Sequence, residues 1–98
     1  MYDVDDRDEE PVELEVTDVL DLHSFPPQQI GELVRDYLVL ASERGFSQVR
    51  IVHGRGVGVQ RERVRRILER DPRVEAFGDA PLEAGGWGAT IVVLKSEN

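Results

Sequence analysis

Apolar residues recur along this chain at two different spacings, which predict two helices and several strands. Helical spacing of three and four residues begins after Pro26-Pro27, a pair that suits the first turn of a helix, and runs to Gly45. A second helical segment follows Gly58 and stops at Asp71-Pro72, because proline disfavours helix in the residue before it. The positions expected to face the core are Ile30, Leu33, Val34, Tyr37, Leu38 and Ala41 in the first helix and Val64, Ile67 and Leu68 in the second.

Shorter apolar runs predict the strands. Residues 19–23, 49–53 and 74–77 are such runs, and residues 89–94 are apolar on both faces, which is typical of an interior strand. Residues 12–16 alternate apolar and acidic positions and predict a short half-exposed strand or an extended segment. The order βαβαββ implies a parallel first pair with right-handed crossovers and an antiparallel last pair. We expect an α/β chain of the α+β two-layer sandwich type, with both helices on one mixed sheet of roughly four strands.

Length and composition favour a single cytoplasmic domain. The chain has 98 residues and no cysteine, which excludes disulfides, thiol catalysis and cysteine-based metal sites and fits a reducing cytoplasm. No segment approaches the roughly 18 apolar residues of a membrane span, and the acidic N-terminus does not resemble an export signal. We expect an acidic disordered arm over residues 1–11 and a domain over residues 12–98, with its core at about 16–95.

The net charge of −8 belongs to the N-terminal segment rather than to the whole chain. Residues 1–20 hold nine acidic side chains and one base, Arg7, so residues 21–98 carry no net charge. Residues 50–73 hold eight arginines against three acidic side chains. An acidic chain therefore does not exclude nucleic acid as a partner, because the local charge of a surface decides binding. The acidic arm would either repel nucleic acid or compete with it for the arginine surface.

The segment Asp21-Leu22-His23 is the first candidate for chemistry. Positions 21 and 23 share one face of a strand, so a carboxylate lies beside an imidazole at the C-terminal end of that strand. Such a pair can orient a general base or offer two ligands to Mg²⁺ or Mn²⁺. One carboxylate and histidines are too few to predict a full magnesium site. The alternative is an exposed polar face near the end of a strand, since this spacing is common by chance.

The second candidate is the glycine-rich segment His53-Gly54-Arg55-Gly56-Val57-Gly58 between a strand and a helix. Glycines let backbone N–H groups approach an anion, and the helix N-terminus adds partial positive charge. Arg55 can bind a phosphate through two parallel hydrogen bonds. The spacing lacks the last residues of a dinucleotide-binding loop, and the chain is too short for that fold. The alternative is a turn shaped only by backbone geometry.

Arginines and one tryptophan complete the candidate residues. The arginines of the second predicted helix either attract nucleic acid or form a solvated face paired with Glu62 and Glu69. Trp87, within Gly85-Gly86-Trp87-Gly88, either stacks on a base or packs in the core, which is the commoner position in so small a domain. The arginines lie on two helical lines, Arg61 with Arg65, and Arg63 with Arg66 and Arg70.

Topology brings the first two candidates to one edge of the sheet. If the first two strands are parallel neighbours, their C-terminal ends lie together, and ligands of open α/β sheets bind at that edge. Asp21, His23 and His53 are then expected to converge beside the glycine-rich segment. Histidines, a carboxylate, an anion-binding loop and arginines together indicate a phosphodiester site.

These residues stand in motifs that resemble those of the Smr (small MutS-related) domain family. The boxes Leu20-Asp21-Leu22-His23 and His53-Gly54-Arg55-Gly56, followed by Gly85-Gly86-Trp87-Gly88-Ala89-Thr90, match its LDxH and (H/T)GxG pattern in order and at suitable spacing. The resemblance covers about residues 16–95. It implies a βαβαββ fold similar to the C-terminal domain of translation initiation factor three. It also implies nicking of DNA or endonucleolytic cleavage of RNA.

We interpret the chain as a stand-alone, monomeric Smr domain that cleaves or nicks nucleic acid. The resemblance matches Asp21 and His23 to the catalytic box and residues 53–56 to the binding loop, with His23 as general base or acid. One departure is Ser24, which follows the box where the family often has glycine. The main alternative is a non-catalytic module that binds nucleic acid, a ribosome or a protein, and a weaker one is a small-molecule phosphate enzyme.

Overall fold

The computed structural model describes residues 16–56 and 58–96. The expected acidic arm and most of the segment 12–16 therefore lie outside the described residues. Short 3₁₀ turns precede α1 and link β4 to β5, at Pro27–Gln29, Leu82–Ala84 (η2) and Gly86–Gly88 (η3). The main elements are β2 (Val19–Asp21), α1 (Ile30–Glu43), β3 (Gln48–Val52), α2 (Val59–Arg70), β4 (Val74–Asp79) and β5 (Ala89–Leu94).

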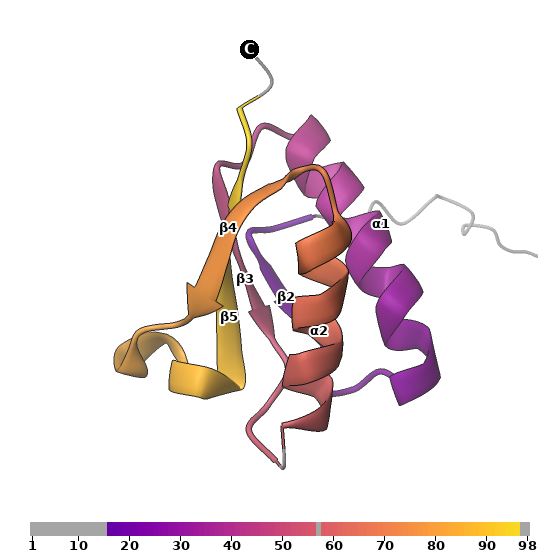
Figure 1. The fold of residues 1–98 in the computed structure, drawn as a ribbon, viewed down its shortest axis with the longest axis vertical. Coiled ribbons are helices and arrows are strands. Elements are labelled where there is room, and N and C mark those ends of the chain that lie inside the picture. Colours follow the sequence, from indigo (N-terminus) through magenta and orange to yellow (C-terminus); the bar gives the residue numbers. More distant parts are fainter. Residues whose placement is uncertain (1–15, 57, 97–98) are drawn as a thin grey trace, which may run out of the picture.

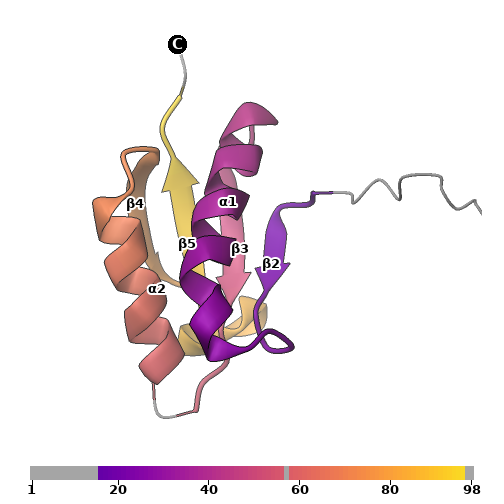
Figure 2. The same ribbon diagram turned by 90° about the vertical axis from the view of Figure 1, so that its right-hand side faces the viewer.

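The strands form one mixed sheet in the order β2-β3-β5-β4. Strands β2 and β3 are parallel, whereas β5 pairs antiparallel with β3 and with β4. Helices α1 and α2 cover the same face of this sheet, and neither covers the other face (Figures 1 and 2). The two-layer α+β architecture, the parallel first pair and the interior position of residues 89–94 are confirmed.

The core lies between the sheet and the two helices. Helix α1 buries the apolar stripe expected from its spacing, except for Leu33, which is half-buried. Beyond apolar packing, the hydroxyl of Tyr37 donates a 2.7 Å hydrogen bond to the carbonyl of Thr17, which ties α1 to the start of β2. The largest side chains with under 2% exposure are Ile30, Leu38, Ile51, Leu68, Val34, Val49, Val64, Val92 and Thr90.

Three element boundaries differ from the predicted ones, at the end of β2, the start of α1 and the end of β4. Strand β2 ends at Asp21, so His23 lies in a turn that is closed by a 3.1 Å bond from Phe25 N–H to the carbonyl of Leu22. Helix α1 starts at Ile30 because the segment after Pro26 first forms a 3₁₀ turn. Strand β4 runs on to Asp79 past an irregularity between Val74 and Ala76.

Register fixes which side chains face the helices at the C-terminal edge of the sheet. Leu20 pairs with Ile51 and Asp21 pairs with Val52, and the N–H of Leu22 donates to the carbonyl of Val52 over 2.8 Å. Ile51 is buried under the helices, so His53, two positions on, faces the same way. The backbones that carry the two candidate segments therefore lie side by side.

Candidate nucleic-acid site

Asp21 and His23 form an exposed hydrogen-bonded pair at the end of β2. One carboxylate oxygen, Oδ1 of Asp21, lies 2.7 Å from Nδ1 of His23 and also accepts the backbone N–H of His23 over 3.0 Å. These bonds, led by the backbone one, hold the pKa of Asp21 below its ordinary value. The side chain of His23 is 76% exposed and that of Asp21 is 50% exposed. Both groups are therefore open to a ligand as large as a polymer.

The bond between the two side chains sets which ring nitrogen of His23 is available. An ionised carboxylate can only accept, so Nδ1 must carry the proton that is donated to Asp21. In the neutral imidazole, Nε2 is then the nitrogen that can take up a proton. Asp21 therefore orients this ring, and a base held in place by a third group in this way is an arrangement used in general base catalysis.

His53 has a different environment, in the interior of the domain. The residue is 7% exposed, with Nε2 at 2.8 Å from the hydroxyl of Thr90 and Nδ1 at 3.1 Å from the carbonyl of Gly54. A carbonyl only accepts, so Nδ1 donates and Nε2 of the neutral ring accepts the Thr90 hydroxyl. Burial lowers the pKa of His53 because it disfavours the charged ring, while the hydrogen bond to the carbonyl of Gly54 acts in the opposite direction. Both ring nitrogens are occupied, so His53 holds the loop in place.

The expected convergence of three side chains is thus only partly met. The backbones of residues 21–23 and 52–53 meet through the bond from Leu22 to Val52. The ring of His53, however, turns to Thr90 on the helix-covered face, while the alternation of β2 places Asp21 on the opposite face.

The glycine-rich loop is clamped against the segment around η3. The carbonyl of Gly88 accepts the N–H groups of His53 and Gly54, over 3.0 and 2.9 Å. A Cβ at Gly88 would lie 2.9 Å from Cγ of Arg55, so only glycine permits this approach. The guanidinium of Arg55 in turn reaches the carbonyl of Gly85 at 3.5 Å. The two glycine-rich motifs therefore form one structural unit.

A small pocket opens where this loop meets the N-terminus of α2. The helix starts after Gly58, whose φ of +86° favours glycine, and no side chain caps its first turn. The N-terminal amide groups are therefore oriented for an anion, with the helix dipole adding to the attraction. The pocket has a volume of about 180 Å³ and is lined by His53, Gly54, Arg55, Gly56, Gly58, Val59 and Gln60.

Trp87 lies beside this pocket rather than in the core. It is 43% exposed, and the guanidinium carbon of Arg61 lies 5.5 Å from the centre of its ring. A Cβ on Gly58 would lie 3.6 Å from the indole, so the tryptophan borders the start of α2. The core position that the sequence favoured is wrong, and an exposed aromatic surface is left next to the loop.

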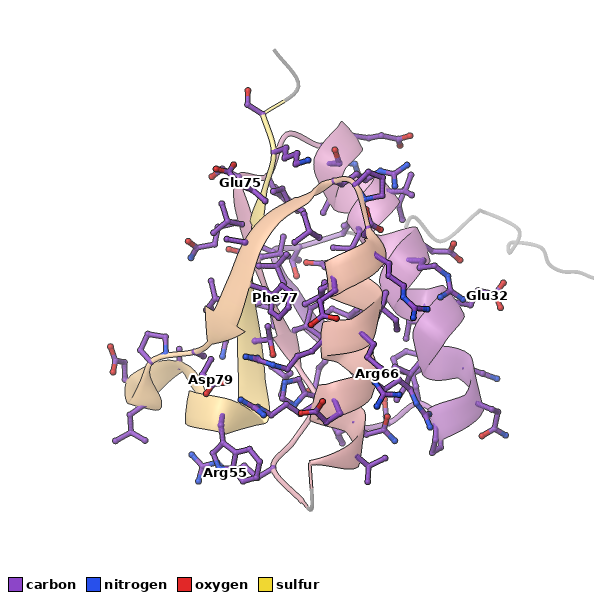
Figure 3. All side chains as sticks on the ribbon, viewed as in Figure 1. Glu32, Arg55, Arg66, Glu75, Phe77 and Asp79 are labelled. Carbon is purple, nitrogen blue, oxygen red and sulfur yellow. The ribbon has the colours of Figure 1, made fainter. Side chains whose placement is uncertain are left out.

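Arg61 and Arg65 are held by a residue that the sequence analysis missed, Asp79. Oδ1 of Asp79 lies 2.7 Å from Nη2 of Arg61 and 3.6 Å from Nη1 of Arg65. The hydrogen bond from Arg61 lowers the pKa of Asp79. Arg65 also lies over the ring of Phe77 at 5.2 Å. Figure 3 shows Phe77 and Asp79 along β4 near α2, with Arg55 at the loop end of the domain.

These two arginines are consequently less available than their spacing suggested. Their side chains are only 20% and 24% exposed, and a carboxylate offsets part of their charge. Asp79 lies two residues beyond the predicted strand 74–77, and its pairing with arginines of α2 depends on how β4 packs beside that helix, which no local pattern reveals.

Neither a metal-ligand cluster nor a membrane-spanning helix is found within the described ranges. Residues 16–56 and 58–96 hold no group of three or more His, Asp or Glu side chains placed to bind a metal ion. In the same ranges, no helix is both long and apolar enough to cross a membrane.

Comparison with known proteins decides the family. The model of the Smr domain family matches residues 20–95. The chain belongs to the Smr family. The crystal structure of the Smr domain of Thermus thermophilus MutS2 superposes with a TM-score of 0.75 and 39% identity, covering 79% of this chain and 96% of that one. A stand-alone small MutS-related protein from Escherichia coli, YdaL, gives a TM-score of 0.75 and 28% identity over 80% of this chain and 64% of that one.

Curated relatives are much longer than this Smr domain. Endonuclease MutS2 of Streptococcus pneumoniae (strain Hungary19A-6) is 55% identical over 76 residues, which are 78% of this chain and 10% of that protein. Endonuclease MutS2 of Thermus thermophilus is 49% identical over 51 residues, or 52% of this chain and 7% of that protein. The chain thus spans a tenth or less of the length of these relatives.

The close contact at Gly88 in this Smr domain makes a first prediction. Gly88→Ala places a methyl group 2.9 Å from Cγ of Arg55, so the clamp on the glycine-rich loop must shift. We expect phosphate or nucleic-acid affinity to fall about tenfold, measured by titration of the full chain. Gly78→Ala is the matched control, because a Cβ there meets no atom within 4 Å. Equal affinities for the two variants would contradict this role of the clamp.

The burial of His53 makes a second prediction, on pH. Its pKa in the folded Smr domain is lowered from 6.5, so the unfolded chain binds the proton more readily. The free energy of unfolding should therefore fall as the pH drops below 6.5. The lowered carboxyl pKa values of Asp21 and Asp79 act in a separate window, below about 4. Urea unfolding at pH 7.5 and 5.0 tests this, and His53→Leu should reduce the difference; an unchanged difference would contradict it.

Proposed function

We propose that this Smr domain cleaves phosphodiester bonds of nucleic acid, nicking DNA or cutting RNA. The observation that carries the proposal is the 2.7 Å bond between Asp21 and His23, which leaves Nε2 of an exposed imidazole as the free ring nitrogen. The glycine-rich loop that can accept an anion starts at the same edge of the sheet, where the N–H of Leu22 is bonded to the carbonyl of Val52. The family match and the endonuclease relatives support the same reaction class.

In the proposed reaction, Nε2 of His23 takes the proton from the attacking oxygen of water or of a ribose hydroxyl. A bond then forms between that oxygen and phosphorus while the bond to the leaving oxygen breaks, and the leaving oxygen is protonated by solvent or by the charged imidazole. Asp21 stabilises the imidazolium through its ionised carboxylate. A positioned general base of this kind contributes about 10²–10⁴-fold in rate.

The phosphate would be held by the loop and the start of α2. The pocket between them accepts an anion through backbone amide groups and the helix dipole. Arg55 lies at its rim with its side chain across η3, where it can add a charged hydrogen bond. Trp87 offers an exposed ring to a base, an interaction worth about 1–3 kcal/mol.

The proposed reaction does not require a divalent ion, and its effect is measured in the assay. Asp21 offers the hard oxygen ligand that Mg²⁺ or Mn²⁺ prefers, and His23 is its neighbour. A bound ion there would neutralise charge that develops on the phosphate. The proton transfer by His23 does not depend on it.

The test is incubation of the full chain with supercoiled plasmid and with a structured RNA, each with EDTA, Mg²⁺ or Mn²⁺. Affinity for both polymers is measured in parallel by fluorescence anisotropy. We expect cleavage of at least one polymer, lost in His23→Ala prepared in the same way. Cleavage that persists in that variant would point to a contaminating nuclease and contradict the proposal.

A non-catalytic recognition module is the second candidate function. The exposure of both Asp21 and His23 favours it, because the pair is not enclosed with a substrate as in many enzymes. The loop and the arginines suffice for binding to nucleic acid or a ribosome. Binding without cleavage under every condition would support this candidate, and Ser24→Gly would then test whether the departure from the family box is responsible.

A further inference from the structure

A groove lined by arginines runs between α1 and α2, apart from the Asp21–His23 pair. It has a volume of about 490 Å³, with Val39, Ile67 and Pro72 among its apolar lining. Four arginines line it, Arg35, Arg66, Arg70 and Arg73, against the carboxylates of Asp36 and Asp71. The groove is therefore a cationic surface with an apolar base.

The arginines that line this groove outnumber its carboxylates by four to two within the described ranges. Asp71 already accepts the backbone N–H of Arg73 at 2.8 Å and faces its guanidinium at 3.4 Å. Among residues 16–56 and 58–96, no carboxylate lies within ion-pair distance of Arg66 or Arg70, and both residues are exposed. This contrasts with Arg61 and Arg65, which share Asp79 on the other side of α2.

The cationic surface continues from the groove to the candidate active site. Arg63, Arg66 and Arg70 follow one face of α2, a rise of about 10 Å along the helix axis. A second depression of about 330 Å³ at the start of α2 is lined by Arg63 and Arg66 with Gly58 and Val59, and by one carboxylate, that of Glu62. Nη1 of Arg63 donates over 2.8 Å to the carbonyl of Pro27, in the segment that follows His23.

We propose that this arginine face binds the sugar-phosphate backbone of the nucleic acid that is cut at His23. The inference rests on the proposed function and adds a second contact surface to it. Each strand of a DNA duplex carries one phosphate per about 3.4 Å of helix axis, so an arginine row of about 10 Å that lies along this axis covers about three phosphate intervals. The apolar lining suits sugar rings, and the row starts beside the loop that carries His23. A cut strand would therefore lie along α2 after leaving the active site.

The salt dependence of binding tests this inference in the full chain. Arg66→Gln/Arg70→Gln is compared with Arg44→Gln/Lys95→Gln, which removes the same charge from exposed residues outside the groove lining. The probe is a fluorescein-labelled 20-base-pair DNA, or a 20-nucleotide RNA if only RNA is bound. We expect the slope of log K against log salt to lose about 1.8 on duplex, or about 1.4 on a single strand, in the groove variant only.

The possible results separate a failure of the arginine face from a failure of the proposed function. Equal salt slopes for the groove and control variants would overturn binding at the arginine face, whether the two variants keep the wild-type affinity or lose affinity equally. The proposed function would still stand. No binding of either probe by the wild-type chain would overturn both proposals. A thermal melt of each variant shows that the exposed substitutions leave the fold unchanged.

Discussion

His23→Ala is expected to lower single-turnover cleavage by about 10²–10⁴-fold while leaving the affinity for nucleic acid within about twofold. The reason is that the substitution removes the only free ring nitrogen of the Asp21–His23 pair without touching the anion pocket. The measurement is the rate of product formation at saturating enzyme, with affinity determined on the same preparation. A rate that falls only in proportion to affinity would contradict a role in proton transfer.

Asp21→Asn separates orientation from charge at the same place. The amide can still accept the backbone N–H of His23, but it lacks the charge that stabilises the imidazolium. Because the pair is exposed and screened by water, we expect a smaller loss than for His23→Ala, about tenfold. Asp18→Asn, on the exposed residue before β2, is the matched control and should leave the rate unchanged.

Thr90→Val is expected to have the largest effect on stability among substitutions near the site. It keeps the shape of a fully buried side chain but leaves Nε2 of His53 without its 2.8 Å partner. An unpaired buried acceptor costs about 1–3 kcal/mol, which would lower the melting temperature by several degrees in a domain of this size. Urea unfolding at pH 7.5 measures the loss.

The control for this prediction is Thr17→Val, whose exposed hydroxyl donates to the carbonyl of Val19 over 3.2 Å and accepts its N–H over 3.3 Å. Its effect should stay within about 0.5 kcal/mol. In the double variant with His53→Leu, the loss from Thr90→Val should largely disappear, since no acceptor is left unpaired. A loss that is independent of His53 would mean that packing of the threonine, rather than its bond to the ring, sets the stability.

The fold could be predicted from the sequence because its signals are local. The stripe from Ile30 to Ala41 follows the helical period and is buried as expected except at Leu33, which is half-buried. The two-sided apolar run of β5 predicted an interior strand, and β5 does lie between β3 and β4. Boundaries were less accurate where a turn replaces the last residues of a strand, as at His23 after β2.

The site was predicted less completely, because its details depend on contacts between distant segments. The proximity of Asp21 and His23 was predicted from their spacing, and they are hydrogen-bonded, but in a turn after β2 rather than on one face of a strand. No local pattern, however, reveals that Asp79 engages the arginines of α2 or that Gly88 receives the glycine-rich loop. A polar residue within an apolar strand, Thr90, was the one available sign of the buried bond to His53.

The most direct test of catalysis by the Asp21–His23 pair compares His23→Ala with Asp21→Asn/His23→Ala in the same cleavage and binding assays. If Asp21 acts through His23, removing the carboxylate after the imidazole has gone costs nothing more. We expect equal residual rates for the two variants and wild-type affinity in both. A further drop in rate in the double variant would show that Asp21 acts independently of the ring. Residual rates equal to the wild-type rate would show that cleavage does not use this pair at all.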